Sequence, residues 1–493
     1  MTAPIPLSRQ NLSRLPDEVS RPAFDPAHLR PGIVHLGLGG FHRAHMARYT
    51  HDLMGQASTL DWGIVGVGLL PSDRRMQEAL GPQDCLYTLV ERQQGEESAT
   101  VIGSICGVIF AGDSSQAVVE AIADPMTRIV SLTVTENGYC LNPATKQLDL
   151  SHPFIIHDLS GMALPRSAIG ILVEAYRRRM MVSQPAWTAL TCDNIQHNGA
   201  VLKAAVLTLA EHRDPRLARW IEANARFPST MVDRITPITT GSDIDYLASR
   251  YGVIDHWPVF SETFRQWVIE DDFVQGRPSW EIVGAQLVAD VAPYEFMKLR
   301  LLNASHLAIA GLGRLAGCTY INEILCNRDF RAYMQALMDR ETGPTLPFVP
   351  GVDIAGYKST LIARFANPNI KDTADRVNAD APINLLIDPI RDRLAADADT
   401  NLLALALAAW MKRVRGMDDA GLPVTTAHPL ADLLRSRAIE GGPDPRPLLS
   451  VTTLFGDLIE NQRFVSTLER WLLALYEHGA RGSIALARRE LGF

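Results

Sequence analysis

The strongest constraint on the fold is a glycine-rich turn that follows a short apolar run near the N-terminus. Residues 33–36 read Ile-Val-His-Leu, which is typical of a buried strand. The turn contains Gly37 and Gly39, and residues 46–54 then have the pattern of a helix. This order is the one that a dinucleotide-binding fold needs. Gly37 permits the tight turn, and Gly39 lets a pyrophosphate approach bare backbone at the start of a helix.

Taken alone, the glycine motif is a weak signal. Its third glycine position holds His42, so the turn reads Gly-x-Gly-x-x-His, and a glycine turn without a ligand is an equally good interpretation. His42 and His45 lie three residues apart, a spacing that suits a metal ion on a helix, but no third ligand stands near them. We therefore expect the two histidines to pack and to form hydrogen bonds, and we expect no metal.

Three further segments have the composition of central strands, and each leads to a polar residue. They are residues 62–69 before Asp73, residues 129–135 before Glu136, and residues 186–191 before Asn194. The carboxyl ends of parallel strands border the crevice in which open α/β sheets bind ligands. A helix is predicted over residues 199–212, so Asn194 also suits an N-cap or an Asx turn. The pattern predicts an α/β, Rossmann-like domain.

Asp73 bears on which dinucleotide such a domain accepts. A carboxylate after the second strand accepts hydrogen bonds from the adenosine ribose and repels a 2′-phosphate. Asp73 is farther from the glycine turn than the usual spacing of about 20 residues. Arg74 and Arg75 follow it directly, within reach of a phosphate. We predict NAD rather than NADP.

A second informative stretch, residues 293–306, is predicted to be a largely apolar helix that carries four polar groups. At 100° per residue from Lys298, Glu295 falls at about 60°, His306 at about 80° and Asn303 at about 140°. A buried lysine is costly unless it is paired or deprotonated, and a lysine poised near neutrality is a usable general base. The alternative is a lysine that extends to water, with Asn303 and His306 as hydrogen-bonded core groups.

The size of the chain and its periodicity predict two domains. A chain of 493 residues is too long for one ordinary core. From about residue 289 onward the periodicity is mostly helical, with helices expected around 308–315, 361–365, 402–414 and 464–475. We expect a nucleotide domain with a polar N-terminal arm over 1–288 and a mainly α-helical domain over 289–493. Junctions of this kind commonly carry ligand clefts.

Composition excludes several classes of function. The formal net charge of −8 and the lack of a basic run argue against a nucleic-acid partner. The most apolar stretch, 402–410, is too short to span a membrane, and the N-terminus does not resemble a signal peptide. The 6 cysteines form no Cys-x-x-Cys pair, which favours reduced, buried thiols in a cytoplasmic protein.

Three motifs together resemble those of the polyol-specific long-chain dehydrogenases, the mannitol 2-dehydrogenase family. They are Gly-x-Gly-Gly-Phe-His-Arg-Ala-His at residues 37–45, Val-Asp-Arg-Ile-x-Pro at 232–237 and Lys-x-x-x-x-Asn-x-x-His at 298–306. The resemblance implies a metal-independent oxidoreductase with a Rossmann-like domain and a helical domain. It adds Gly40, Phe41 and Glu136 to the cofactor-binding candidates. We expect a structural or interdomain role for Asp233 and Arg234.

The resemblance also implies a role for each catalytic candidate. Lys298 is the general base, Asn194 and Asn303 donate hydrogen bonds to the reacting oxygen, and His306 positions the substrate or the lysine. Arg376, in a segment similar to one that contacts substrate hydroxyls, binds the distal part of the substrate. Glu295 exchanges protons with solvent or tunes the lysine.

The substrate implied by the resemblance is an uncharged polyol or 2-ketose, D-mannitol and D-fructose first. The rival is a hexuronate reductase acting on fructuronate and mannonate, whose substrate carries a carboxylate and needs an extra cation. Arg300 falls at about 200° from Lys298 and is expected to point away, while Asn137 is neutral where a lysine would favour an acid. A nucleotide-binding regulator without catalysis is a third possibility, which the intact set of Lys298, Asn303 and His306 disfavours. The resemblance favours a monomer.

Overall fold

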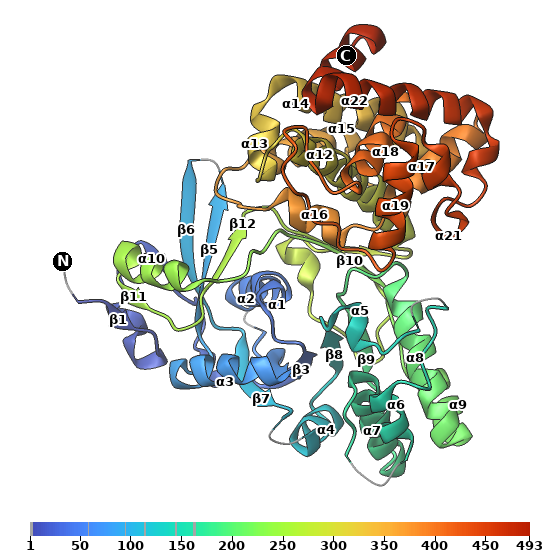
Figure 1. Ribbon diagram of the computed structural model, residues 1–493. Coiled ribbons are helices and arrows are strands. Elements are labelled where there is room, and N and C mark those ends of the chain that lie inside the picture. The colour runs from blue at the N-terminus through green and yellow to red at the C-terminus, as the bar shows by residue number, and fades with distance from the viewer. Residues whose placement is uncertain (1–2, 58, 94, 113–114, 143–144, 161–163) are drawn as a thin grey trace. The chain divides into compact units, whose positions relative to one another are not determined.

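The computed structural model describes residues 3–57, 59–93, 95–112, 115–142, 145–160 and 164–493 (Figure 1). The chain divides into two compact units, Met1–Ala292 and Pro293–Phe493, which we call the N-terminal unit and the C-terminal unit. In neither is a described helix both long enough and apolar enough to cross a membrane.

The centre of the N-terminal unit is a five-stranded parallel sheet of order β7-β4-β3-β8-β9. Its strands are β3 (Pro31–Leu36), β4 (Gly63–Gly68), β7 (Ile105–Phe110), β8 (Ile129–Leu132) and β9 (Thr188–Thr191). From β3 the chain first builds outward through β4 and β7, then returns to β8 on the other side of β3. The strand order therefore reverses between β3 and β8, which is where sheets of this type bind ligands.

Both faces of this sheet are buried, which explains why its strands are apolar almost throughout. Val34 and Val130 pack with residues of α4, α7 and α8 on one face, while Ile33 and Ile129 pack with residues of α1 and α2 on the other. The helices of this unit are α1 (Gly40–Ala44), α2 (Met46–Ala57), α3 (Arg74–Leu80), α4 (Ser115–Ala123), α5 (Thr135–Gly138), α6 (Pro153–Leu159), α7 (Ala168–Met181), α8 (Asn198–Arg213), α9 (Pro215–Asn224) and α10 (Gly241–Tyr251). The predicted Rossmann-like architecture is confirmed.

Three smaller sheets complete the N-terminal unit. Their orders are β12-β5-β6-β2, β10-β13-β14 and β1-β11. The strands are β1 (Ile5–Pro6), β2 (Val19–Ser20), β5 (Tyr87–Gln93), β6 (Glu96–Ile102), β10 (Thr230–Asp233), β11 (Val253–Ile254), β12 (Val259–Glu262), β13 (Gln266–Glu270) and β14 (Gln286–Val288). The expectation of a polar arm over 1–30 is wrong for its described part. That segment pairs with residues 99–100 and 253–254, which local sequence does not reveal.

The C-terminal unit is built from helices, with isolated bridges but no named strand among its described residues. Its central helix, α12 (Ala304–Leu315), packs against α16 (Ala374–Asp380) and α18 (Asn401–Arg413), and α18 packs along α22 (Gln462–Leu491). The other helices are α13 (Ile321–Cys326), α14 (Arg328–Leu337), α15 (Ile354–Phe365), α17 (Asn384–Ala395), α19 (Ala431–Gly441), α20 (Arg446–Leu449) and α21 (Thr452–Phe455).

The predicted helix over residues 293–306 is present but is not a regular α-helix. It consists of α11 (Ala292–Met297), a π-helical turn η6 (Lys298–Asn303), and then α12. The prediction assumed 100° per residue throughout, so its angles across Lys298–Asn303 are wrong. All six cysteines are free, but the prediction of buried thiols holds only for Cys140 and Cys192, since three others are partly buried and Cys326 is exposed.

Candidate functional site

The glycine turn after β3 has a backbone that only glycine adopts easily. Gly37 has φ +93°, and a Cβ added to it would lie 2.1 Å from the carbonyl oxygen of Thr133, which follows β8. The amide of Gly37 donates to Val67 O at 2.9 Å, which ties the turn to the neighbouring strand β4. The first glycine is therefore required by both conformation and space.

Gly39 and Gly40, in contrast, face open space. The nearest atoms to an added Cβ are Gly37 O at 3.8 Å and Thr236 Cγ2 at 3.7 Å, respectively. Gly39 is the N-cap of α1, and no side chain caps that helix start. First-turn amides without a side-chain cap beside unobstructed backbone suit the pyrophosphate of a dinucleotide. The residues present here fit such a cofactor.

The histidines of this segment are buried and neutral. The rings of His35 and His42 stack with centroids 3.4 Å apart, and His45 lies 2.9 Å from Gln266 O. Burial lowers the pKa of His35 and of His45 to about 3, and it lowers the pKa of His42 as well. His45 packs and forms a hydrogen bond as predicted. Neither ring nitrogen of His42 has a hydrogen-bond partner among the described residues, so the expected hydrogen bonding of His42 is wrong and stacking is its contact.

Asp73 closes the turn that follows β4. Its Oδ2 accepts hydrogen bonds from the amides of Leu69 at 3.0 Å and Leu70 at 2.9 Å. The guanidinium groups of Arg74 and Arg75 stack on aromatic rings, Arg74 over Phe110 at 4.6 Å and Arg75 over Trp257 at 4.7 Å. The carboxylate thus has a structural contact through one oxygen, and its Oδ1 has chemistry suited to a ribose hydroxyl.

The segment after β8 is fixed by a buried carboxylate that sequence reasoning missed. Asp193, at the end of β9, accepts hydrogen bonds from the amides of Val134 at 3.1 Å and Thr135 at 2.7 Å, and from the Tyr139 hydroxyl at 2.8 Å. Thr135 has φ +61°, so this segment needs such support. Burial raises the pKa of Asp193. An acidic residue directly after a strand was the available signal.

Two of the predicted residues at this edge of the sheet are exposed. Glu136, on α5, forms an ion pair of 2.6 Å with Lys146. Asn194 directly follows Asp193 beyond β9 and is exposed. Asn198, four residues later, is fully buried and binds Asp193 O at 3.0 Å and Thr230 O at 2.9 Å. The second asparagine of the segment therefore has a structural role, and the first is accessible to a ligand.

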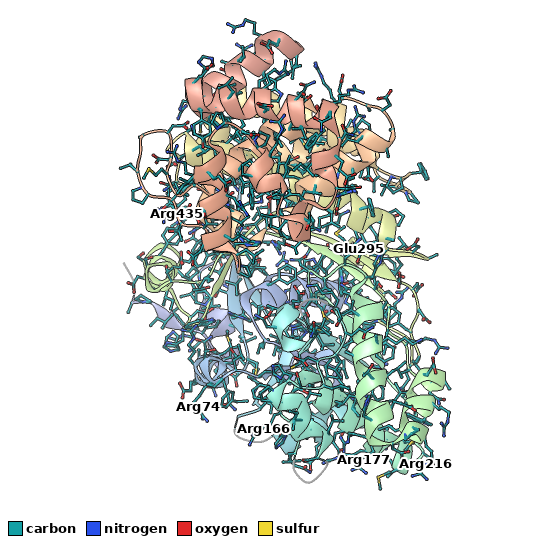
Figure 2. All side chains as sticks on the ribbon, turned by 45° about the vertical axis from the view of Figure 1, so that its right-hand side comes forward. Arg74, Arg166, Arg177, Arg216, Glu295 and Arg435 are labelled. Carbon is teal, nitrogen blue, oxygen red and sulfur yellow. The ribbon has the colours of Figure 1, made fainter. Side chains whose placement is uncertain are left out.

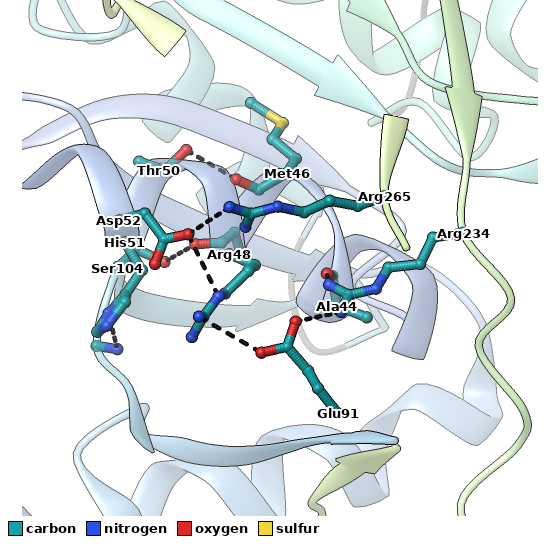
Figure 3. Close-up of polar contacts among 12 residues, drawn as sticks. Ala44, Met46, Arg48, Thr50, His51, Asp52, Glu91, Ser104, Arg234 and Arg265 are labelled. Atoms are coloured by element: carbon teal, nitrogen blue, oxygen red, sulfur yellow. Dashed lines mark hydrogen bonds and ion pairs between the residues drawn. The ribbon is translucent and has the colours of Figure 1, made fainter. Parts of the chain in front are cut away.

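Arg234 is held at one end of a chain of charged side chains (Figure 3). Its fully buried guanidinium donates to Ala44 O at the end of α1 and to a carboxylate oxygen of Glu91. The chain continues from Glu91 to Arg48 at 3.4 Å and from Arg48 to Asp52 at 3.3 Å. These contacts join α1, α2 and β5 within the N-terminal unit, which supports the structural role predicted for the Val-Asp-Arg-Ile-x-Pro motif.

In the C-terminal unit, the π turn η6 changes the relation between Lys298 and Asn303. The amide of Ala304 donates to Leu299 O, an i→i+5 bond. Such a turn holds about one residue more than an α-helical turn, so residues five apart are separated by a smaller angle than in an α-helix. Lys298 and Asn303 are five residues apart. The turn brings them to the same side of the helix, in place of the separation of about 140° that α-helical geometry gave.

The polar groups around η6 are largely buried. Glu295, labelled in Figure 2, lies on α11 and is 7% exposed, and Lys298 is half-buried. The Oδ1 atom of Asn303 is buried and has no hydrogen-bond partner among the described residues. Because a buried amide oxygen without a partner is costly, this atom marks a place where a ligand group completes the hydrogen bonding.

His306 and Arg376, predicted from separate segments, are linked through Asp372. A carboxylate oxygen of Asp372 lies 3.6 Å from Nε2 of His306, and its two oxygens accept from Arg376 at 2.6 and 2.5 Å. The His306 ring stacks on Phe365 with centroids 4.2 Å apart. Sequence reasoning missed the role of Asp372. Its only signal was its position four residues before Arg376, at the start of a helix.

Arg300 lies on η6 but belongs to another cluster. Its guanidinium donates to Asp392 on α17 at 2.6 Å. The prediction that Arg300 points away from the other polar groups of the helix agrees with this ion pair. Among the described residues of the whole chain, no group of three histidine, cysteine or acidic side chains has the arrangement of a metal site.

Two family models together match most of the chain. The mannitol dehydrogenase Rossmann domain matches residues 31–282, and the mannitol dehydrogenase C-terminal domain matches residues 290–476. The chain is 42% identical over 490 residues to mannitol 2-dehydrogenase of Phaeosphaeria nodorum, covering 98% of this chain and 86% of that protein. It is 44% identical over 481 residues to D-mannonate oxidoreductase of Escherichia coli, covering 96% of this chain and 98% of that protein.

A solved structure is similar over the full length. The ternary complex of Pseudomonas fluorescens mannitol 2-dehydrogenase with NAD and D-mannitol is 40% identical, with a TM-score of 0.87. The match covers 99% of this chain and 100% of that one.

Proposed function

The chain belongs to the mannitol dehydrogenase family, and from this premise we propose that it interconverts D-mannitol and D-fructose by hydride transfer to and from NAD. At the coarser level it is an oxidoreductase for polyols or sugar acids that uses a nicotinamide dinucleotide. The observation that carries the proposal is the π turn, which brings Lys298 and Asn303 to one side of a helix ahead of the linked pair His306 and Arg376.

The dinucleotide is proposed to bind at the glycine turn. The open backbone of Gly39 and Gly40, with Phe41, receives the pyrophosphate, and Asp73 and Glu136 contact the ribose side of the cofactor. When bound, NAD supplies the hydride acceptor for oxidation. A carboxylate at Asp73 favours NAD over NADP because a 2′-phosphate is repelled. A lower Michaelis constant for NADP than for NAD contradicts this assignment.

Lys298 acts as the general base in polyol oxidation. In its neutral form, its Nζ takes the proton from the secondary hydroxyl whose carbon gives up the hydride, and in ketose reduction it returns that proton. Glu295, one turn before it, exchanges the proton with solvent or tunes the lysine.

Asn194 and Asn303 are proposed to stabilise the same oxygen as it becomes an alkoxide. Each carboxamide has an N–H₂ group that donates to negative charge, and one such donor contributes about 3–4 kcal/mol to transition-state stabilisation. The buried amide of Asn303, with an oxygen that has no partner among the described residues, supports a ligand at that position. The exposure of Asn194 at the end of β9 supports its access to substrate.

His306 and Arg376 are proposed to bind the rest of the polyol. Asp372 binds Arg376 through two hydrogen bonds and lies 3.6 Å from His306, which fixes the direction in which the guanidinium of Arg376 offers its remaining donors to hydroxyl groups. A linear polyol has acceptors along its whole length, so a guanidinium that is already oriented by one carboxylate is a suitable contact for the end distant from the reacting carbon.

A hexuronate reductase is the second candidate, and the 44% identity to the Escherichia coli D-mannonate oxidoreductase favours it. Its substrate needs a cation for the carboxylate. Arg300 is already paired with Asp392, and Asn137 on α5 is neutral, and both facts support the uncharged polyol. A non-catalytic nucleotide-binding regulator is the weaker alternative, because the catalytic set is intact.

Substrate-dependent change in nicotinamide absorbance tests the proposal. The purified enzyme is assayed with NADH and fructose or fructuronate, and with NAD and mannitol, sorbitol, arabinitol or mannonate. We expect kcat/KM to be highest for mannitol and fructose. Higher kcat/KM for fructuronate than for fructose assigns the enzyme to hexuronates, and no turnover with any substrate supports the regulator.

We also propose that the enzyme is a monomer, which light scattering during gel filtration tests.

A further inference from the structure

A cavity in the C-terminal unit is lined by a buried cation that has no ionic partner among the described side chains. The cavity has a volume of about 390 Å³ and is lined by residues of α16, α17 and α18, by the segment 426–429 and by α21. This volume is within the range of about 300–1,000 Å³ that small-molecule sites occupy. Arg413 is the charged residue among the described residues that line it, and it is 2% exposed.

Arg413 is poorly satisfied by the protein itself. One of its terminal nitrogens donates to Thr425 O at 3.3 Å, and its Nε is buried with no hydrogen-bond partner among the described residues. The neighbouring carboxylates of Asp375 and Asp418 are paired with Arg314, at 3.0 and 3.2 Å. No described carboxylate forms an ion pair with Arg413. A buried charge of this kind is costly unless an anion joins it.

Two further lining residues have polar atoms without partners. The Oδ1 atom of Asn378 and the Oγ1 atom of Thr426 are both buried and form no hydrogen bond with any described residue. Asn378 is 5% exposed, and its other amide atom is bound to Ala374 O at 2.8 Å. An acceptor at Asn378 and a hydroxyl at Thr426 suit hydroxyl groups of a ligand.

Arg413 is the charge that the cavity offers, so the ligand is expected to carry about one negative charge. Burial lowers the pKa of Arg413 to about 10, so it remains protonated at neutral pH, whereas burial lowers the pKa of His428, which is then neutral. Trp410 and Ile383 supply apolar walls. One cation suits a carboxylate, which a guanidinium binds through two parallel hydrogen bonds, better than a phosphate dianion.

We propose that this cavity binds a small hydroxylated carboxylate, with Arg413 on the carboxylate and Asn378 and Thr426 on its hydroxyls. The site is distinct from the polyol contacts assigned above and does not depend on them. The competing explanation is that Arg413, in the last turn of α18, only anchors the carbonyl of Thr425 and the end of its helix.

Equilibrium dialysis with D-gluconate tests the proposal, and D-sorbitol is the matched neutral probe because it differs in having an alcohol in place of the carboxylate. We expect wild-type enzyme to bind gluconate at millimolar concentration or below and to bind it at least about tenfold more tightly than sorbitol. Absence of gluconate binding, or equal binding of inorganic phosphate, overturns the assigned ligand class.

Two matched arginine variants locate the site. Arg413→Met should weaken gluconate binding at least about tenfold, while Arg415→Met, two residues along and exposed, should leave it unchanged. Without ligand, Arg413→Met should unfold at the same or a higher temperature, because an unpaired buried charge is removed. A lower unfolding temperature together with unchanged gluconate affinity identifies Arg413 as an anchor only and overturns the proposal.

Thr426→Val retains the arginine and keeps the test decisive if Arg413→Met does not fold. We expect gluconate affinity to fall by about threefold to tenfold in this variant, and an unchanged affinity contradicts the site. Arg376→Ala separates the cavity from the proposed polyol contacts. Gluconate affinity should not change in it. If affinity is lost there and kept in Arg413→Met, gluconate binds at the catalytic residues and the proposal fails.

Discussion

The glycine turn of the N-terminal unit and the π turn of the C-terminal unit both place functional groups by departing from regular backbone, but they present different groups. At Gly37 and Gly39 the backbone itself is presented, and the histidines around it are buried in neutral form. At η6 the residues are buried or partly buried, and Lys298 and Asn303 are presented as side chains. The first arrangement suits a ligand recognised by its phosphates, and the second suits chemistry.

The two turns also differ in what each requires of the sequence. The N-terminal turn needs a residue without a Cβ, because Thr133 O occupies the space beside Gly37. The C-terminal turn tolerates ordinary side chains but needs one additional residue in the helix. A substitution should therefore disable the N-terminal turn, and an inserted residue should disable the arrangement at the C-terminal turn.

Inserting one alanine after Leu299 is expected to have the largest effect on activity. The insertion places Lys298 and Asn303 six residues apart and turns Asn303 by roughly 100° further around the helix from Lys298. Turnover should fall by roughly 10³-fold, as for loss of a positioned general base, while NAD affinity stays close to wild type. Steady-state kinetics and NAD titration measure both. Leu299→Ala, which keeps the residue count, is the control, and equal turnover in the two variants would show that the π turn has no role.

Gly37→Ala is the corresponding test of the N-terminal turn. The added methyl group meets Thr133 O and forces an alanine into positive φ, so we expect destabilisation on the order of 3 kcal/mol with weakened NAD binding. Urea unfolding and NAD titration measure these two changes. Gly40→Ala, where space is open, should leave the free energy of unfolding almost unchanged. Similar destabilisation in both variants contradicts the steric account.

The buried acid Glu341 gives the C-terminal unit a stability that depends on pH. Its two carboxylate oxygens accept hydrogen bonds from the backbone amides of Leu402 and Leu403, at 2.8 and 2.7 Å. Burial raises the pKa of Glu341 from 4.5 to about 7. The contribution of protonated Glu341 to the free energy of unfolding is complete below pH 4.5 and is lost as pH rises through 7. The free energy of unfolding of wild type relative to Glu341→Gln should fall by roughly 2–3 kcal/mol over that interval. Parallel curves for the two proteins refute the assignment.

His51 should give the N-terminal unit the opposite dependence. Its Nδ1 accepts a hydrogen bond of 3.1 Å from the backbone amide of Gly103, and burial lowers the pKa of His51 from 6.5 to about 3. Its contribution is present above pH 6.5 and is lost as pH falls toward 3. Compared with His51→Asn, whose amide oxygen can accept the same bond, wild type should lose about 2 kcal/mol between pH 6.5 and 5. Unfolding curves at both pH values test this, and an equal change in both proteins rules it out.

The parts of the site that sequence predicted are those that depend on local pattern. A strand followed by glycines identified the turn at Gly37, and a polar residue at a strand end identified Asn194. The role of Asp372 was not predicted because it depends on proximity to His306, a residue on another helix. The π turn was not predicted because the helical pattern was converted to angles at a fixed 100° per residue.

The fold shows the same division between local and distant information. The alternation of strands and helices predicted the Rossmann-like sheet, whereas the pairing of residues 19–20 with 99–100 depends on segments that are far apart in the chain. The cavity at Arg413 is assembled from α16, α17, α18 and two later segments. No single stretch of the sequence contains enough of its lining to indicate a site.

The central claim is that the amine of Lys298 moves the proton of the reacting hydroxyl. Its most direct test is the turnover of Lys298→Ala with added methylamine. We expect turnover to fall by about 10²–10⁴-fold with NAD affinity retained, and methylamine to restore part of it in proportion to the concentration of free amine. If the variant keeps more than about a tenth of wild-type turnover without added amine, Lys298 is not the base.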